Sequence, residues 1–341
     1  MNSGLLLEHR SAVHTRVTGC YSPFHHDRNH TMTTTVGVIG LGNMGGGMAA
    51  TLARHDFPVF GFDLSQAARD KAAASGVTPV DSLTELLAKV EVVILSLPKA
   101  EHVERLCLGG EDAPVSDAAD DHQAESLLAL ARPGLIVIDT TTSTPETSRK
   151  VAAALATRGI DFIDAPVSGG PKGAASGSMS MVIGAEDEVL ARAMPVLEAM
   201  SGSRVHVGRC GAGNVAKIAN NMLAACHLIS TAEAVAMAAR AGVSPEKLLE
   251  GVNAGSGRSG ASQVMFPNWV INKAYDSGFT MGLMRKDVGL ASDLAQQLGM
   301  ELPLANAVAQ LWNESRATLD DREDFCAIVQ RTDPTLFGHG A

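Results

Sequence analysis

Lys217 and Asn221 lie four residues apart in a proline-free stretch, 213–241, that is rich in alanine, leucine, isoleucine and methionine. Residues four apart share one face of a helix. A lysine on a helix is usually a solvated surface residue, but the surrounding apolar residues at 218–219 and 222–223 are compatible with a cleft position. A lysine that is partly desolvated in a cleft has a lowered pKa and can exchange a proton with a bound oxygen near neutral pH.

A glycine-rich turn is the second candidate. Gly40, Gly42 and Gly45 form the pattern G-x-G-x-x-G directly after an apolar run that begins at Val36. The first glycine permits a tight turn, the second lets the backbone approach a pyrophosphate at a helix N-terminus, and the third lets helix and strand pack closely. The predicted cofactor-binding residues of this turn are Gly40, Leu41, Gly42, Asn43, Met44 and Gly45. A glycine-rich turn without a dinucleotide is the alternative.

Asp63 follows a second apolar run, 59–62, and lies 18 residues after Gly45. An acidic side chain at this distance can accept hydrogen bonds from the adenosine ribose hydroxyls and would repel a 2′-phosphate. Residues 64–66 are Leu-Ser-Gln, so no arginine follows Asp63 directly. The sequence therefore predicts NAD rather than NADP as the cofactor.

Strand and helix signals alternate through the first half of the chain. Ser82 and Glu85 form a capping-box pattern at a helix start, and Pro145 suits the first turn of another helix. The expected strands begin at Val36 and continue at 59–62, 92–97, 135–138, 162–163 and 179–183. This alternation predicts a doubly wound parallel sheet with ligands beyond the carboxyl ends of its strands, which places 97–98 and 140–142 at the cofactor cleft.

The second half is predicted to be helical. A helix over 213–241 would be ~40 Å long at 1.5 Å per residue, enough to bridge two domains, and Gly242 suits its C-terminal end. Residues 244–245 (Ser-Pro) begin the next helix, and further helices are expected at 286–298 and 303–313. The predicted fold is a Rossmann-type α/β sheet domain and an all-helical domain joined by the long helix.

Composition limits the classes of partner. The chain has 341 residues, a length typical of about two domains. The predicted divisions are an extension at 1–31, an NAD-binding domain at 32–197, a helical domain at 198–332 and a tail at 333–341. The formal net charge of -10 argues against nucleic acid or an anionic membrane as the main partner, but leaves a small anionic substrate open. No apolar run reaches the ~20 residues that span a bilayer.

Two segments stand apart. Residues 1–31 hold five of the eleven histidines without apolar periodicity, and we expect a disordered extension or a start codon assigned too early. A mitochondrial transit peptide is the alternative to the cytoplasmic location that we expect. Residues 109–125 are acidic, and we expect an exposed loop there. The five cysteines are scattered without a Cys-x-x-Cys pair, so the sequence predicts no metal site.

Four motifs together resemble the β-hydroxyacid dehydrogenase family over about residues 34–332. The motifs are Gly40-Leu-Gly-Asn-Met-Gly45; Asp164-Ala-Pro-Val-Ser-Gly-Gly170, followed by Gly173-Ala174 and Gly177; Gly213-Asn-Val-Ala-Lys217-Ile-Ala-Asn-Asn221; and Lys286-Asp287-Val-Gly-Leu-Ala291. That family includes 3-hydroxyisobutyrate dehydrogenase, L-threonate dehydrogenase, tartronate semialdehyde reductase and sulfolactaldehyde reductase.

The resemblance implies a role for each matching residue. Lys217 corresponds to the catalytic lysine and Asn221 to a residue that holds the substrate. The implied substrate-binding residues are Ser168, Gly169 and Gly170. The implied cofactor residues outside the glycine-rich turn are Leu97, Pro98, His102, Thr142 and Lys286. A serine hydroxyl beside successive glycine amides also suits an anion such as the substrate carboxylate.

The implied function is NAD-dependent oxidation of a small 3-hydroxy acid, with 3-hydroxyisobutyrate as the default substrate. L-Threonate, L-serine and the reduction of tartronate semialdehyde or sulfolactaldehyde remain open. A non-enzymatic relative or an imine reductase should lack the lysine. The resemblance also implies a homodimer or homotetramer.

The second half departs from the family pattern. Many 3-hydroxyisobutyrate-type members carry a tryptophan where residues 256–260 have glycine. The pocket is then expected to be wider, or to be filled from Phe266 or Trp269, and Arg258 could face a second polar group of the substrate. This departure leaves the substrate open.

Overall fold

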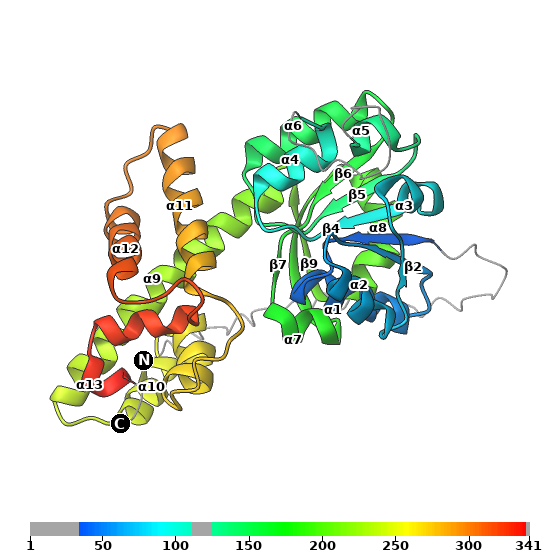
Figure 1. Ribbon diagram of the computed structural model, residues 1–341. Coiled ribbons are helices and arrows are strands. Elements are labelled where there is room, and N and C mark those ends of the chain that lie inside the picture. The colour runs from blue at the N-terminus through cyan, green and yellow to red at the C-terminus, as the bar shows by residue number, and fades with distance from the viewer. Residues whose placement is uncertain (1–33, 111–124, 339–341) are drawn as a thin grey trace, which may run out of the picture. The chain divides into compact units, whose positions relative to one another are not determined.

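The computed structural model describes residues 34–110 and 125–338. Within these ranges the chain forms one sheet flanked by helices, followed by helices only from α9 (Ala212–Arg240) onward (Figure 1). The predicted fold class is therefore confirmed. The predicted extension at 1–31 and most of the predicted acidic loop lie outside the described residues.

The strands are β1 Val36–Ile39, β2 Val59–Phe62, β3 Thr78–Pro79, β4 Val92–Leu95, β5 Ile136–Asp139, β6 Asp161–Asp164, β7 Val167–Ser168, β8 Met179–Gly184 and β9 Ser201–Gly208. Neighbours follow the order β3-β2-β1-β4-β5-β6-β8-β7, with β9 paired to β8. The first six are parallel, so the segments that follow β1, β4, β5 and β6 share one edge of the sheet.

The far side of the sheet differs from the purely parallel pattern that the sequence predicts. β8 runs antiparallel to β6 and β7. The segment 169–178 between β7 and β8 is shorter than the dozen or more residues of a parallel crossover. β7 and β9 are absent from the sequence prediction because β7 has two residues, and β9 is a largely exposed strand without an apolar run.

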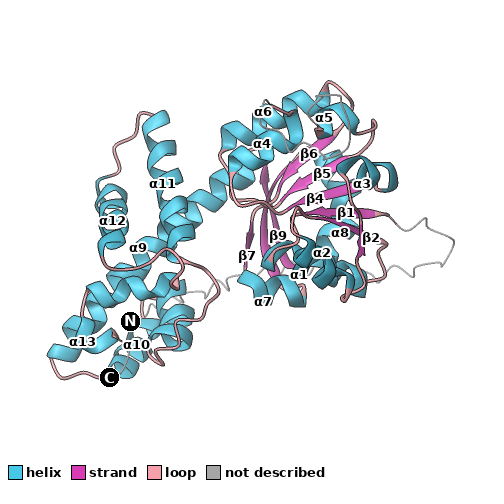
Figure 2. Ribbon diagram, viewed as in Figure 1, coloured by secondary structure: helices cyan, strands magenta, loops and turns pink. Residues whose placement is uncertain are grey.

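Helices cover both faces of the sheet. One face carries α1 Asn43–Arg54, α2 Gln66–Ala73, α7 Gly170–Ser176 and α8 Asp187–Met200, and the other carries α3 Leu83–Lys89, α4 Ala100–Leu108, α5 Leu127–Leu130 and α6 Pro145–Ala156 (Figure 2). Met48 and Leu197 belong to the first apolar cluster, and Leu86 and Leu155 to the second. Because both faces are covered, β1, β4 and β5 are buried throughout, which explains their unbroken apolar runs.

The helices after β9 pack around α9. They are α10 Pro245–Ala254, the π-helix η1 Ala261–Val270, α11 Met281–Gln297, α12 Pro303–Glu314, the 3-10 helices η2 Ser315–Ala317 and η3 Phe325–Arg331, and α13 Pro334–Phe337. Phe266 and Trp312 are fully buried in their common core. The 29 residues of α9 span ~43 Å at 1.5 Å per residue, and Gly242 follows with a positive φ of 86°, as the sequence predicts. η1, which contains Pro267, was not predicted.

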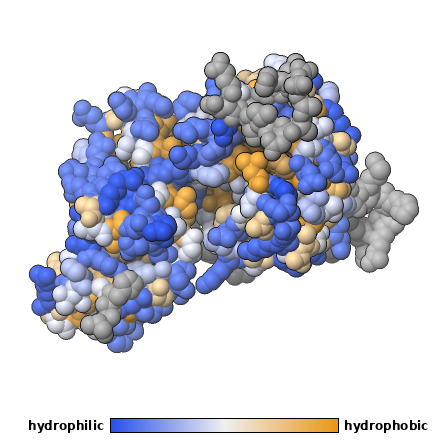
Figure 3. Space-filling view, in the orientation of Figure 1, coloured by the Kyte–Doolittle hydropathy of each residue, from blue (hydrophilic) through white to orange (hydrophobic). Residues whose placement is uncertain are grey.

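α9 is long and apolar enough to cross a membrane by length and composition. In the described structure it contacts β8, α6, α10, α11 and α12. On the face shown in Figure 3, hydrophilic residues cover most of the described surface, and apolar residues form smaller areas among them. The α9 side chains of Met237 and Leu223 remain 71% and 49% exposed.

Candidate active site

The glycine-rich turn connects β1 to α1 and requires glycine at two positions. Gly40 has a φ of 88°, and a Cβ there would lie 2.3 Å from the carbonyl oxygen of Ser96. A Cβ on Gly45 would lie 1.8 Å from the carbonyl oxygen of Gly40, so only glycine lets α1 approach β1 this closely. A Cβ on Gly42 would meet no described atom within 4 Å. The backbone at Gly42 is thus open to a close-lying group at the N-terminus of α1, which fits a dinucleotide pyrophosphate.

Asp63 stands at the end of β2, next to this turn. Its Oδ2 accepts a hydrogen bond from the main-chain N–H of Leu41 (2.7 Å), and its Oδ1 accepts one from Ser65 N–H (2.8 Å). A carboxylate has about four acceptor sites, so capacity remains for ribose hydroxyls. Arg69 also lies here and donates a hydrogen bond to the main-chain carbonyl oxygen of Asp63. The sequence prediction did not include this cation.

The segments after β4 and β5 lie beside the turn. Leu97 N–H donates to Thr141 Oγ1 (3.1 Å), which joins these two segments. A Cβ on Gly40 would be 3.4 Å from the Leu97 side chain. Pro98 is exposed, and His102 lies on α4 with its Nδ1 buried and without a hydrogen-bond partner among the described residues. The predicted cofactor residues before β5 thus share one edge of the sheet with the glycine-rich turn.

Lys217 is buried on α9 at 6% exposure, so it is not a solvated helix lysine. Its Nζ donates to Ser168 Oγ at 2.8 Å. The pKa of Lys217 is lowered to about 8, mainly by burial; the carboxylate of Asp287 opposes the shift, and Lys286 adds to it. A lysine with such a pKa exists in both protonation states near neutral pH, as a group that both accepts and returns a proton requires.

Asn221 lies one turn further along α9, and Asp287 of α11 orients it. The Nδ2 of Asn221 donates to Asp287 Oδ2 at 2.5 Å, and its Oδ1 accepts from Asn220 Nδ2 at 3.0 Å. Asp287 is 1% exposed. Asp287 belongs to the fourth family motif, but no role was predicted for it. Its place beside Lys286 in that motif was the available signal.

Lys286 connects the helical part of the chain to the sheet edge. Its Nζ donates to the carbonyl oxygen of Thr142 (3.1 Å) and lies 3.2 Å from Asp287 Oδ1. The second contact is an ion pair by distance only, because no described residue donates a hydrogen bond to Asp287 Oδ1. Thr142, Lys286, Asp287 and Asn221 therefore form a continuous chain of contacts.

The Ser168 loop combines a hydroxyl with an unusual backbone. Gly169 and Gly170 have consecutive positive φ values of 121° and 60°, a conformation that L side chains rarely adopt. Successive amides in such turns can point at one anion. A Cβ on Gly170 would lie 3.5 Å from the carbonyl oxygen of Ser277, so a residue of the helical part lies close to this loop. Ser168 and Lys217 are in contact, whereas no hydrogen bond among the described residues joins them to the glycine-rich turn.

Two buried acidic residues lie at the strand ends near the site, and the sequence did not identify them as site residues. Asp139 and Asp164 end the adjacent strands β5 and β6 and are neighbours in register. Burial raises the pKa of Asp139 to about 7 and that of Asp164 to about 6. Asp164 accepts hydrogen bonds from Gly211 N–H and Asn214 N–H at the start of α9. Asp139 Oδ1 accepts from a main-chain N–H, and its Oδ2 has no partner in the described residues.

Replacing Asp139 with asparagine is expected to stabilise the protein more at pH 8 than at pH 5. The raised pKa means that the folded state binds more protons than the unfolded state between pH 3.8 and about 7, so wild-type stability falls as pH rises through this window. Asparagine cannot ionise, so the free energy of unfolding of the variant relative to wild type should increase by about 2–3 kcal/mol from pH 5 to pH 8. Urea denaturation measures it, with Asp293→Asn on the exposed face of α11 as control. If Asp139→Asn changed the free energy of unfolding by the same amount at both pH values, the raised pKa of Asp139 would be contradicted.

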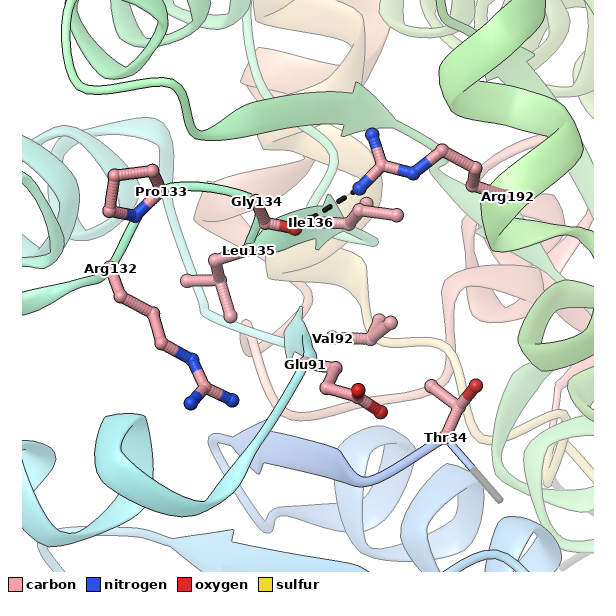
Figure 4. A pocket seen from close by; sticks show the side chains of 9 residues that line it. All are labelled: Thr34, Glu91, Val92, Arg132, Pro133, Gly134, Leu135, Ile136 and Arg192. Carbon is pink, nitrogen blue, oxygen red and sulfur yellow. Dashed lines mark hydrogen bonds between the residues drawn. The ribbon is translucent and has the colours of Figure 1, made fainter. Parts of the chain in front are cut away.

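A cavity of about 530 Å³ lies elsewhere, at the amino ends of the strands (Figure 4). It is lined by Thr34, Glu91, Val92, Arg132, Pro133, Gly134, Leu135, Ile136 and Arg192. Arg192 donates to Asp161 (2.6 Å) and to the carbonyl oxygen of Gly134 (3.1 Å). Arg132 donates to the carbonyl oxygen of Val90 (3.3 Å). This cavity contains none of the predicted site residues, and its arginines are already engaged.

A sheet with a glycine-rich turn for a dinucleotide, together with helices that supply a buried lysine, defines a class of NAD(P)-dependent dehydrogenases. Two family models match the chain. Residues 35–208 match the NAD binding domain of 6-phosphogluconate dehydrogenase, and residues 211–332 match the NAD-binding domain of NADP-dependent 3-hydroxyisobutyrate dehydrogenase. The chain belongs to the 3-hydroxyisobutyrate dehydrogenase family of β-hydroxyacid dehydrogenases, which confirms the resemblance.

Individual relatives are similar over most of their length. The 3-hydroxyisobutyrate dehydrogenase of Pseudomonas aeruginosa is 39% identical over 286 residues, which are 82% of this chain and 91% of that protein. The NAD-dependent L-serine dehydrogenase of the same organism is 36% identical over 306 residues, 88% of this chain and 98% of that protein. The structure of Mycobacterium tuberculosis 3-hydroxyisobutyrate dehydrogenase with L-serine has a TM-score of 0.78 and 35% identity, and covers 89% of this chain and 100% of that one.

Proposed function

We propose that the protein oxidises the hydroxyl group of a small 3-hydroxy acid with NAD and uses Lys217 as the proton acceptor. The observation that carries this proposal is the buried ammonium of Lys217 on the Ser168 hydroxyl, with its pKa lowered to about 8 by burial. A neutral amine at this place can accept a proton from a substrate hydroxyl that binds next to Lys217 Nζ at the Ser168 loop.

The proposed reaction balances as loss of a hydride and a proton from the alcohol. When bound, the nicotinamide supplies the hydride acceptor. Neutral Lys217 takes the hydroxyl proton on Nζ during oxidation, and protonated Lys217 returns it during reduction. In the oxidation direction, loss of the hydride from carbon and of the proton from oxygen converts the carbinol into a carbonyl. The burial of Lys217 keeps competing water away from Nζ.

Two groups are proposed to hold the substrate. The Ser168 hydroxyl and the amides of Gly169 and Gly170 receive its carboxylate, because this backbone can direct several donors at one anion. Asn221 has one N–H of its amide committed to Asp287 and the other available to a substrate oxygen. Asp287 therefore holds the orientation of Asn221.

NAD is the proposed cofactor, with the glycine-rich turn at its pyrophosphate and Asp63 at its adenosine ribose. Leu97, Pro98, His102, Thr142 and Lys286 are the proposed residues on the nicotinamide side. Asp63 supports NAD because its carboxylate lies 2.7 Å from the main-chain nitrogen of Leu41 in the glycine-rich turn. The NAD-dependent relative supports the same choice.

3-Hydroxyisobutyrate and L-serine are the proposed substrates to test first. The names of two relatives support them, and so does the L-serine in the M. tuberculosis structure. Both molecules carry a carboxylate at C1 and a primary hydroxyl at C3. This arrangement fits a site in which an anion-binding loop lies beside a proton acceptor. Self-association into a dimer or tetramer is also proposed, and the exposed apolar side chains of α9 support it.

A substrate panel tests this function. The purified protein is assayed for NADH formation with 3-hydroxyisobutyrate, L-serine, L-threonate and D-glycerate, and for NADH consumption with tartronate semialdehyde. L-Lactate, a 2-hydroxy acid, is the matched negative control. We expect turnover with at least one 3-hydroxy acid and none with L-lactate. NADH binding by fluorescence without turnover of any 3-hydroxy acid would overturn the proposal.

A further inference from the structure

The first turn of α9 is held by a buried polar cluster that does not include Lys217. Asn214 is fully buried at its centre. Its main-chain N–H donates to Asp164 Oδ2 (2.8 Å), its Oδ1 accepts from the main-chain N–H of Ser143 (2.9 Å), and its Nδ2 donates to Ser148 Oγ (3.0 Å). Every hydrogen-bonding atom of the Asn214 side chain therefore faces a segment that is distant in sequence.

Two of these partners, Ser143 and Asp164, belong to segments that carry a site residue, and the third, Ser148, lies on α6. Ser143 directly follows Thr142, whose carbonyl oxygen receives Lys286. Asp164 ends β6 and precedes Ser168 by four residues. Asn214 thus joins the helix of the lysine, the loop on the cofactor side and the strand that leads to the proposed anion loop.

The first turn of α9 packs closely against the end of β6. A Cβ on Gly213 would lie 2.6 Å from the carbonyl oxygen of Asp164, so the helix backbone lies directly on the end of β6. Asn214 and Lys217 are three residues apart and share a helix face. Any shift or rotation of the first turn therefore displaces the lysine Nζ relative to Ser168.

We propose that Asn214 is a positioning residue for Lys217, which fixes the depth and rotation of α9 so that the lysine amine meets the Ser168 loop. The inference rests on the proposed role of Lys217. The charged groups that act on Lys217 are Asp287 and Lys286, both on α11, whereas Ser168 on β7 and Asn221 on α9 are neutral. Asn214 itself is uncharged and acts only through the placement of the helix.

Asn214→Ala is expected to lower kcat by about 100-fold, because a misplacement of about 1 Å at a reacting group costs this much. The KM of the 3-hydroxy acid should change far less, and the Kd of NADH should stay the same. The midpoint of the pH–rate profile for oxidation should move up from about 8 toward the ordinary lysine value of 10.5, because a displaced Lys217 regains water.

Ser201→Ala is the matched control. Ser201 is also buried, and its Oγ donates to the carbonyl oxygen of Leu197 (2.6 Å) at the junction of α8 and β9. The Ser201→Ala variant should lose stability as Asn214→Ala does, but it should keep the wild-type kcat and the wild-type midpoint of the pH–rate profile. If Asn214→Ala does not fold, Ser148→Ala carries the test. It removes the Nδ2 contact of Asn214 and a local hydrogen bond from Ser148 Oγ to the carbonyl oxygen of Thr144, and it should shift kcat and the midpoint in the same direction.

A second readout separates this inference from the proposed function. The pH dependence of Lys217 acylation by an amine-selective reagent, followed by peptide mass spectrometry, reports the lysine pKa without turnover. A raised midpoint in the Asn214 variant supports positioning, even if Lys217→Ala were to retain activity and so overturn the proposed function. An Asn214 variant with unchanged kcat, pH midpoint and acylation midpoint would overturn the positioning role.

Discussion

Lys217→Ala is expected to lower kcat for oxidation by about 10²–10⁴-fold, the usual contribution of a general acid–base group. The loss follows from removal of the amine that lies 2.8 Å from Ser168 Oγ. Binding of NADH should remain close to wild type, because the glycine-rich turn and Asp63 are untouched. Steady-state assays and a fluorescence titration on the same preparations measure the two effects.

Two further variants define the cause of that loss. Lys217→Met keeps most of the side-chain volume and should lose as much activity as Lys217→Ala, which separates the proton transfer from packing. Lys247→Ala removes an exposed lysine that pairs with Glu250, and it should leave kcat unchanged. A kcat within a few-fold of wild type for both Lys217 variants would refute the role of the lysine.

Wild-type protein is expected to prefer NAD over NADP by at least about 100-fold in kcat/KM. A 2′-phosphate would meet the carboxylate of Asp63, and like charges in contact cost several kcal/mol, of which each 1.4 is tenfold. Asp63→Asn removes the charge and keeps one of the two main-chain contacts, so the preference should fall sharply. Initial rates with the two cofactors under identical conditions measure the ratio.

The position of Arg69 in the structure adds a second variant to the test of cofactor preference. Its guanidinium donates to the carbonyl oxygen of Asp63, so it is near enough to meet a 2′-phosphate once the carboxylate is gone. The double variant Asp63→Asn/Arg69→Ala should therefore use NADP less well than Asp63→Asn. Equal use of both cofactors by the wild type would show that Asp63 does not select between them.

Local patterns predicted the elements that carry the site. The apolar runs became buried parallel strands because both faces of the sheet are covered, and the glycine spacing became the turn in which Gly40 and Gly45 have no room for a Cβ. The long helix and the shared face of Lys217 and Asn221 followed from the absence of proline and from helix periodicity.

Contacts between distant segments were not predictable in the same way. Asp287 meets Asn221 across 66 positions, and Asn214 meets Ser143 across 71. Both residues belong to family motifs, but a motif in one sequence does not reveal which distant side chain or main-chain group each residue contacts. The antiparallel β8 likewise depends on the path of the chain after β7, which apolar runs do not encode.

The pH dependence of the reaction in both directions tests the role of Lys217 most directly. Oxidation needs the neutral amine and reduction the ammonium, so one group with a pKa of about 8 should control both. With the best 3-hydroxy acid and NAD, kcat/KM should rise about tenfold per pH unit from pH 6 and level off above about 8. With the corresponding carbonyl compound and NADH, kcat/KM should fall above the same midpoint. Profiles that are flat from pH 6 to 10, or that persist unchanged in Lys217→Met, would contradict the account.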